Sequence, residues 1–215
     1  MFPLYDDNPT QRQAVVVPLL ILGCAGVFFY QFVTGDAQPI RQFGMIPAVL
    51  FADPGREWVR LLGSQFLHGN LVHLFSNMWF LWIFGNNVED RLGPGRFLGF
   101  YLACGAIAAL AQGLAAPQSN VPLIGASGAI AGVMGAYALC FPRARIVTAV
   151  FLLFFFTLVR IPAVVYLGFW IVFEVVRAAQ ANPGLPGVAY LAHVAGFGAG
   201  VLLWWGMGGN DEINR

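Results

Sequence analysis

Long stretches without a single charged side chain constrain the fold of this chain more than any other feature of its sequence. Residues 14–33, 61–88 and 97–142 contain no Asp, Glu, Lys or Arg. A membrane-spanning helix needs about 20 mostly apolar residues. Charged residues make up 10% of the chain, against about 25% in an ordinary soluble domain. The sequence therefore predicts an integral membrane protein built from helices.

Turn-forming residues divide these stretches into six predicted crossings. The run at 97–142 is too long for one helix and is interrupted by a Pro-containing turn at 117–122, so we expect it to fold back as two helices. The other crossings are predicted at residues 14–33, about 65–86, 162–179 and 188–207. The expected fold class is an all-α integral membrane protein, with a six-helix bundle over 14–208 and short tails at 1–13 and 209–215.

One apolar segment fits none of the crossings. Residues 146–159 are rich in aromatic side chains but lie between Arg145 and Arg160. As a helix they would extend about 21 Å, whereas the apolar core of a bilayer is about 30 Å thick. We therefore expect an interfacial or re-entrant segment. The long loop between the first two helices is expected to lie on the membrane surface, because it carries apolar residues such as Phe43 and Trp58.

The charges give an orientation and exclude one class of partner. All 11 basic residues are Arg, and seven of them fall on the side that six crossings assign to both termini. Positive residues concentrate on the cytoplasmic side of membranes, so we expect a bacterial inner membrane with cytoplasmic termini. A net charge of +1 without a basic stripe excludes a nucleic-acid partner. The three cysteines lie in apolar runs and are interpreted as packing residues.

Three predicted crossings carry polar residues at membrane depth. His73 and Asn77 are four residues apart and share one face of the second helix, and His68 lies nearer its outer end on another face. Ser127 follows the turn before the fourth helix, and His193 belongs to the sixth. A rise of about 1.5 Å per residue, measured from each inner helix end, places these three helices' polar residues about 10 Å below the outer face. We expect them to converge in one layer.

Glycine stripes provide a means of convergence. Both helices concerned have glycines at helical spacing: Gly128, Gly132 and Gly135 on the fourth, and Gly196 and Gly200 on the sixth. Small residues at this spacing let helix backbones approach closely. If the two stripes face each other, Ser127 and His193 meet.

The combination of Ser127 and His193 favours nucleophilic chemistry. A serine hydroxyl becomes a nucleophile when a base within hydrogen-bond distance accepts its proton, and a neutral imidazole suits this task near pH 7. His73, Asn77 and the backbone N–H groups at the start of the fourth helix are candidate oxyanion donors. No Asp lies at this depth in any predicted span, so we expect a dyad rather than a triad. Glu174 is interpreted as a satisfied interfacial charge.

Each polar residue also has a structural interpretation when taken alone. Ser127 would be a packing residue, and His193 a buried histidine bound to a carbonyl. His68 and His73 would be interhelical hydrogen-bonding groups or a metal pair. The joint occurrence at one depth favours the catalytic interpretation. The chain has no H-E-x-x-H motif, no paired membrane aspartates and no Lys for another membrane-protease chemistry.

Three short motifs occupy the second, fourth and sixth predicted helices. They are H-x-x-x-x-H-x-x-x-N with His68, His73 and Asn77, G-x-S-G with Gly125, Ser127 and Gly128, and A-H-x-x-G with Ala192, His193 and Gly196. Together they resemble the rhomboid family of intramembrane serine proteases, over about residues 14–208, and residues 85–93 resemble the family's inner loop. The resemblance implies that Ser127 is the nucleophile and His193 the general base. It further implies that His73 and Asn77 donate hydrogen bonds to the oxyanion. Four residues would support the site: His68, Gly125, Gly128 and Gly196.

The implied function is that of a serine endopeptidase that cuts transmembrane segments of other proteins near the outer face. A peptide bond must leave its helix before attack, so segments weakened by Gly or Pro are the expected substrates. No cofactor or metal is expected. The alternative is a rhomboid-like protein that binds clients without cleaving them, although such relatives would be expected to lack the serine or the histidine. A small transporter would instead carry an inverted repeat or a polar stripe across the membrane.

Overall fold

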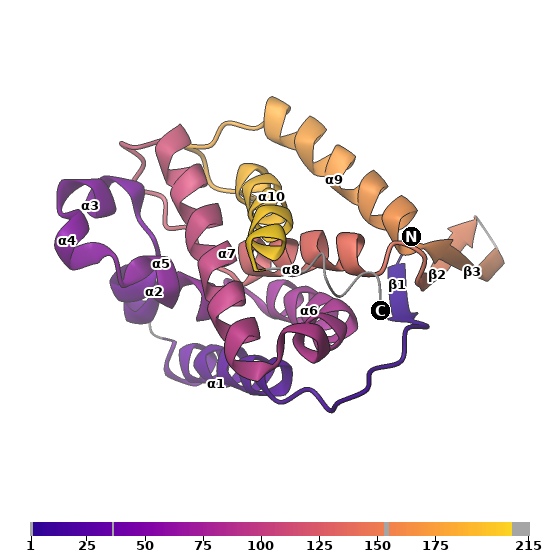
Figure 1. Ribbon diagram of the computed structural model, residues 1–215. Helices are drawn as coiled ribbons and strands as arrows, with labels where there is room; N and C mark the ends of the chain where they lie inside the picture. Colours follow the sequence, from indigo (N-terminus) through magenta and orange to yellow (C-terminus); the bar gives the residue numbers. More distant parts are fainter. Residues whose placement is uncertain (1, 36, 153–154, 208–215) are drawn as a thin grey trace.

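The computed structural model describes residues 2–35, 37–152 and 155–207, most of which are helical (Figure 1). The six longest helices of this part are α1 (Val16–Thr34), α6 (Leu71–Leu92), α7 (Pro94–Ala115), α8 (Ser127–Cys140), α9 (Ala163–Gln180) and α10 (Tyr190–Gly206). Short helices follow α1, namely α2 (Gln38–Phe43), α3 (Pro47–Ala52), α4 (Pro54–Glu57), α5 (Arg60–Gly63) and the 3-10 helix η1 (Ser64–Phe66). The strands β1 (Phe2–Asp6), β2 (Arg145–Leu152) and β3 (Phe155–Pro162) form one sheet.

The long helices lie in the six predicted ranges, with shifted ends. The helix expected at about 65–86 begins at Leu71 and continues to Leu92 as α6, and the fourth expected helix begins only at Ser127. Within the described residues, α1, α7 and α9 are long and apolar enough to cross a membrane, and α8 is apolar but has 14 residues. The number of crossings therefore stays a prediction. The expected tail at 209–215 lies outside the described residues.

The described chain is mostly helical, as expected, but it also contains a three-stranded sheet, so the fold is not all-α. β2 and β3 form an antiparallel hairpin over the segment expected to be interfacial or re-entrant, with Val147 opposite Arg160. β1, within the expected N-terminal tail at 1–13, pairs with β2. The physical reason is the local composition, because β-branched and aromatic residues dominate the segment and pack well in strands. A hairpin also brings Arg145 and Arg160 to the same end of the ladder.

Polar contacts fix β1 against the helices. The Trp79 indole of α6 donates to the Pro3 carbonyl at 2.7 Å, and the Tyr137 hydroxyl of α8 donates to Asp6 at 2.5 Å. Burial raises the pKa of the Asp6 carboxyl above its ordinary value, although the bond from Tyr137 opposes this effect. The Asp7 carboxylate accepts from the Arg145 backbone N–H at 2.7 Å. The N-terminal residues are therefore an integral part of the fold.

A buried carboxylate joins α1 to α6. Glu89 of α6 is 3% exposed, and its two oxygens accept the backbone N–H groups of Val15, Val16 and Val17 at 2.7 to 2.8 Å. These groups belong to the first turn of α1 and have no partner within a helix. Residues 85–93 are expected as an inner loop, but α6 continues through them to Leu92. Gly93, with a φ of +74°, ends the helix.

The two glycine stripes face each other where α8 crosses α10. A Cβ atom at Gly196 would meet the Gly128 carbonyl, and one at Gly200 would meet the Gly132 carbonyl. Figure 1 shows α10 near the centre of the molecule, between α7 and α9 and crossing α8. The short helices α2 to α5 lie at one end of the molecule and the sheet lies at the opposite end.

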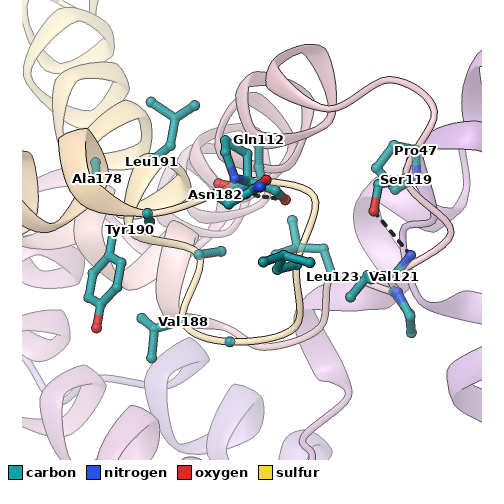
Figure 2. A pocket seen from close by; sticks show the side chains of 16 residues that line it. Pro47, Gln112, Ser119, Val121, Leu123, Ala178, Asn182, Val188, Tyr190 and Leu191 are labelled. Atoms are coloured by element: carbon teal, nitrogen blue, oxygen red, sulfur yellow. Dashed lines mark hydrogen bonds between the residues drawn. The ribbon is translucent and has the colours of Figure 1, made fainter.

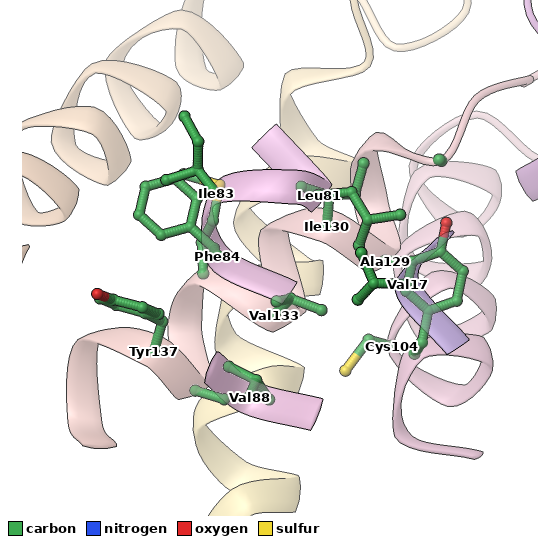
Figure 3. Packing of buried hydrophobic residues seen from close by; sticks show 14 of the residues in the cluster. Val17, Leu81, Ile83, Phe84, Val88, Cys104, Ala129, Ile130, Val133 and Tyr137 are labelled. Carbon is green, nitrogen blue, oxygen red and sulfur yellow. The ribbon is translucent and has the colours of Figure 1, made fainter. Parts of the chain in front are cut away.

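An apolar core fills the space where α6, α7 and α8 meet, with α1 packed against α6. Figure 3 shows side chains from all four helices in this core, among them Val17, Leu81, Phe84, Cys104, Val133 and Tyr137. Each of these is fully or almost fully buried. All three cysteines are free, and Cys24 and Cys104 are buried in this core, so they act as small packing residues.

Candidate active site

Ser127 is the first residue of α8 and is held there by an unusual turn. Gly125, two residues earlier, has a φ of +121°, which L side chains rarely adopt, and its N–H donates to the Ser64 carbonyl at 2.9 Å. A Cβ atom at Gly125 would lie 2.7 Å from Nε2 of His73. Glycine is therefore required both by the backbone conformation and by the close approach of the histidine ring.

The structure places Ser127 beside His193 of α10. The distance from Ser127 Oγ to His193 Nε2 is 2.9 Å, which is a hydrogen bond. The two helices meet along their glycine stripes, so little side-chain bulk separates their backbones. Rings from two elements flank the imidazole, since the centroid of Trp170 lies 6.0 Å away and that of Tyr190 6.4 Å away.

Glu174 of α9 contacts the His193 ring at the nitrogen that does not face Ser127. Its Oε2 lies 2.7 Å from Nδ1 of His193, and Glu174 is 7% exposed. Glu174 is therefore buried against His193 and is not the interfacial charge expected from the sequence, whereas the expectation of a catalytic dyad stays a prediction. The three side chains form a continuous hydrogen-bonded chain from α8 through α10 to α9.

The sequence contained a signal for this carboxylate. Six residues separate Glu174 from the end of α9 at Gln180, a rise of about 9 Å. This depth matches the layer of about 10 Å inferred for the other polar residues. The depth of a polar residue on the fifth predicted helix, counted from that helix's outer end, therefore identifies Glu174 as a member of the same layer.

His73 and Asn77 of α6 line the same cavity as Ser127 and His193, whereas His68 lies behind them. His73 is in the first turn of α6, where the Asn70 side chain accepts its N–H at 2.8 Å. Asn77 Nδ2 donates to the His73 carbonyl at 3.0 Å. His68 is 1% exposed, and its ring centroid lies 5.1 Å from that of His73. His68 therefore supports the His73 ring and does not line the cavity.

The cavity around these residues has a volume of about 640 Å³. Its polar wall carries Ser127, His193, His73, Asn77 and Glu174, and apolar side chains such as Phe80, Met134, Trp170 and Val188 complete it. A volume of several hundred Å³ suits a peptide segment rather than a single ion. Among the residues that the structure describes, no group of three or more His, Cys, Asp or Glu side chains is placed to hold a metal ion.

A second cavity, of about 50 Å³, is drawn in Figure 2, and it shares lining residues such as Leu123 and Val188 with the first. Gln112 of α7 donates to the Pro183 carbonyl at 3.2 Å, and Ser119 donates to the Gly184 carbonyl at 3.3 Å. These bonds attach the turn before α10 to the elements around it. Val188 lines both cavities, so this turn forms a wall between them.

Comparison with known proteins gives the family of this chain. The profile of the rhomboid domain matches residues 55–210. The match covers well over half of the sequence and includes Ser127, His193, Glu174 and the two polar residues of α6. The chain belongs to the rhomboid family.

Similar proteins come from several compartments. Rhomboid-like protein 11, chloroplastic, of Arabidopsis thaliana is 34% identical over 212 residues, which cover 93% of this chain and 68% of the relative. Rhomboid protein 1, mitochondrial, of Saccharomyces cerevisiae is 33% identical over 152 residues, which cover 69% and 36%. Rhomboid protease GluP of Bacillus subtilis is 45% identical over 80 residues, which cover 37% and 15%. The chain thus spans only a small part of the last two relatives.

Proposed function

We propose that this rhomboid-family protein is an intramembrane serine endopeptidase. The observation that carries the proposal is the 2.9 Å bond between Ser127 Oγ and His193 Nε2, at the wall of a cavity of about 640 Å³. A hydroxyl and an imidazole so placed, with room for a peptide beside them, meet the geometric requirement for nucleophilic catalysis. A serine that served only to pack two helices would need neither the imidazole nor the cavity.

Ser127 and His193 divide the chemistry between them. The His193 imidazole accepts the hydroxyl proton as Oγ attacks the carbonyl carbon of the scissile peptide bond. The tetrahedral intermediate collapses, the C–N bond breaks, and the imidazolium gives its proton to the leaving amine. Water, deprotonated by the same imidazole, then attacks the acyl carbonyl carbon. The ester bond between that carbon and Oγ breaks, Oγ takes the proton back from the imidazolium, and the acyl product leaves as a carboxylic acid.

The negative charge that develops on the carbonyl oxygen needs hydrogen-bond donors. His73 and Asn77 line the cavity beside Ser127, and only one hydrogen of the Asn77 amide is used by the His73 carbonyl. The start of α8 adds backbone N–H groups and the positive end of its dipole. His68 and the glycines at 125, 128 and 196 support this arrangement by fixing the His73 ring and the contact between α8 and α10.

The substrate class follows from the surroundings of the site. Apolar helices enclose the cavity, and by the six-crossing prediction the site lies about 10 Å below one face of the membrane. Transmembrane segments of other proteins are the substrates that reach such a site, and segments weakened by Gly or Pro expose a carbonyl most readily. The partners proposed are thus transmembrane proteins and the lipid bilayer, and no cofactor takes part.

The rival function is that of a rhomboid-like protein that binds clients without cleaving them. The presence of both Ser127 and His193, hydrogen-bonded to each other, favours the protease. The Arg distribution supports our proposal of a bacterial inner membrane with cytoplasmic termini. The similar proteins come from a chloroplast, a mitochondrion and a bacterium, so they favour no single one of these membranes.

The test is cleavage of a transmembrane reporter by the purified full chain in detergent. The reporter carries a Gly-Pro pair below the intended cut, and a second reporter with Leu at both positions serves as the substrate control. The enzyme variants are S127A and H193A, with T157A as the control for loss of a hydroxyl, because Thr157 is exposed on β3 and lines neither cavity.

Wild type and T157A are expected to cleave the weakened reporter at similar rates, and S127A and H193A are expected to show no cleavage. Cleavage that persists in S127A contradicts the assignment of the nucleophile. Cleavage lost on adding a chelator points instead to a metal enzyme. Specific binding of the reporter without cleavage by wild type supports the client-binding alternative.

A further inference from the structure

Glu174 is an acidic side chain buried within a membrane helix, and the proposed Ser–His chemistry does not use it. Its side chain is 9% exposed, although the residues on either side of it on α9, Phe173 and Val175, are 54% and 48% exposed. α9 therefore directs this carboxylate inward and the two apolar side chains beside it outward. An ionised group at membrane depth is costly unless it is paired. The position of this carboxylate thus requires a partner.

That partner is Nδ1 of His193, at 2.7 Å. A neutral imidazole carries one proton, so the nitrogen that donates and the nitrogen that accepts are set by their neighbours. A carboxylate accepts only, and it therefore favours the tautomer with the proton on Nδ1. Nε2 is then left with its lone pair directed at the Ser127 hydroxyl, 2.9 Å away.

The same bond fixes the orientation of the ring. Glu174 holds one edge, Ser127 holds the other, and Trp170, one turn before Glu174 on α9, lies beside the ring with its centroid 6.0 Å away. During attack the imidazole becomes a cation. A carboxylate at hydrogen-bond distance stabilises this cation in surroundings where water is scarce.

We propose that Glu174 is the third member of the catalytic chain in this protein, a positioning residue that sets the tautomer and orientation of His193. This inference rests on the proposed function, because it assigns Glu174 a role in activating Ser127. It differs from the dyad expected from the sequence motifs, because it adds a carboxylate from α9 to the serine of α8 and the histidine of α10.

A purely structural role is the main alternative. The bond between Glu174 and His193 also ties α9 to α10, so its loss could loosen the helix rather than the chemistry. The two roles differ in what they change. Loss of orientation lowers kcat with little change in KM, whereas a loosened helix changes substrate binding and thermal stability.

The experiment measures kcat, KM and melting temperature for wild type, E174A, E174Q and R177Q, using the weakened transmembrane reporter. Arg177 is the matched control, because it lies on α9 three residues away, is exposed and stacks over Phe173 outside the cavity. We expect kcat of E174A to fall about 10- to 1000-fold with KM within about threefold of wild type. E174Q keeps an oxygen that accepts the Nδ1 proton and is expected to lose less. R177Q is expected to match wild type.

The outcomes separate this inference from the function on which it rests. Unchanged kcat in E174A, while S127A is inactive, overturns the positioning role and leaves the protease intact. A raised KM and a lowered melting temperature with unchanged kcat assign Glu174 to structure and also overturn it. If wild type cleaves no reporter and S127A behaves identically, the proposed function itself fails.

Discussion

Substituting Gly200 by Ala tests the contact that brings together α8, which carries Ser127, and α10, which carries His193. A Cβ atom at this position would lie 2.7 Å from the Cα of Gly132 and would meet its carbonyl group. Carbon atoms in ordinary contact are about 3.5 to 4.0 Å apart, so α8 and α10 must separate by about 1 Å. The obstacle is backbone, which cannot rotate away as a side chain can. Overpacking of this kind costs about 1 to 3 kcal/mol of the free energy of unfolding.

The same displacement acts on the site. His193 lies on α10 two turns before Gly200, and Ser127 lies on α8 near Gly132, so a separation of the helices lengthens the bond between Oγ and Nε2. A misplacement of about 1 Å lowers a rate by about 100-fold. We expect G200A to lose about this much activity in the reporter assay and to melt at a lower temperature.

The matched control is G198A, on the same helix. A Cβ atom at Gly198 has no atom within 4 Å, and replacing Gly by Ala within a helix is favourable by about 0.5 to 1 kcal/mol. G198A is therefore expected to retain its activity and to melt at the same or a slightly higher temperature. Equal melting temperatures and rates for G198A and G200A would refute the argument that backbone contact between α8 and α10 sets the site.

Three further substitutions test other parts of the structure. E89A removes the carboxylate that caps α1 and should lower the free energy of unfolding by about 2 to 4 kcal/mol, measured by thermal unfolding, with D90A losing less. N77A should lower kcat by about 10- to 1000-fold, less than H193A, with KM unchanged; an unaltered kcat would exclude it as an oxyanion donor. Burial raises the pKa of the Asp6 carboxyl, so the folded state favours the protonated form. The contribution of Asp6 to the free energy of unfolding is therefore present below about pH 4 and is lost as the pH rises. D6N should flatten this dependence in melting curves.

The features that follow from local sequence could be predicted. Charge-free runs set the positions of the long helices, because apolarity and length are properties of each segment by itself. The meeting of Ser127 with His193 could be anticipated from two local patterns, the common depth of the polar residues and the glycine stripes. Both patterns depend only on the regular rise and rotation of a helix.

The features that depend on distant partners could not be predicted. β2 pairs with β3, its neighbour in the sequence, whereas β1 lies near the N-terminus, far from both. Residues 2–6 carry no local pattern that predicts pairing with β2. α6 also extends beyond the predicted end at about residue 86. Glu89 lies inside the helix because the N–H groups at the start of α1, far away in the sequence, stabilise its carboxylate there. Glu174 is a different case, because the sequence gives its depth in the membrane but its burial depends on how α9 packs on α10.

The most direct test of the central claim is mass spectrometry of the purified protein after treatment with a fluorophosphonate, which reacts with activated serine hydroxyls. We expect one adduct, on Ser127, in wild type, and none in H193A, because the imidazole 2.9 Å away activates the hydroxyl. An adduct on Ser127 that forms equally well in H193A, or cleavage of the reporter by a protein whose Ser127 never reacts, would contradict it.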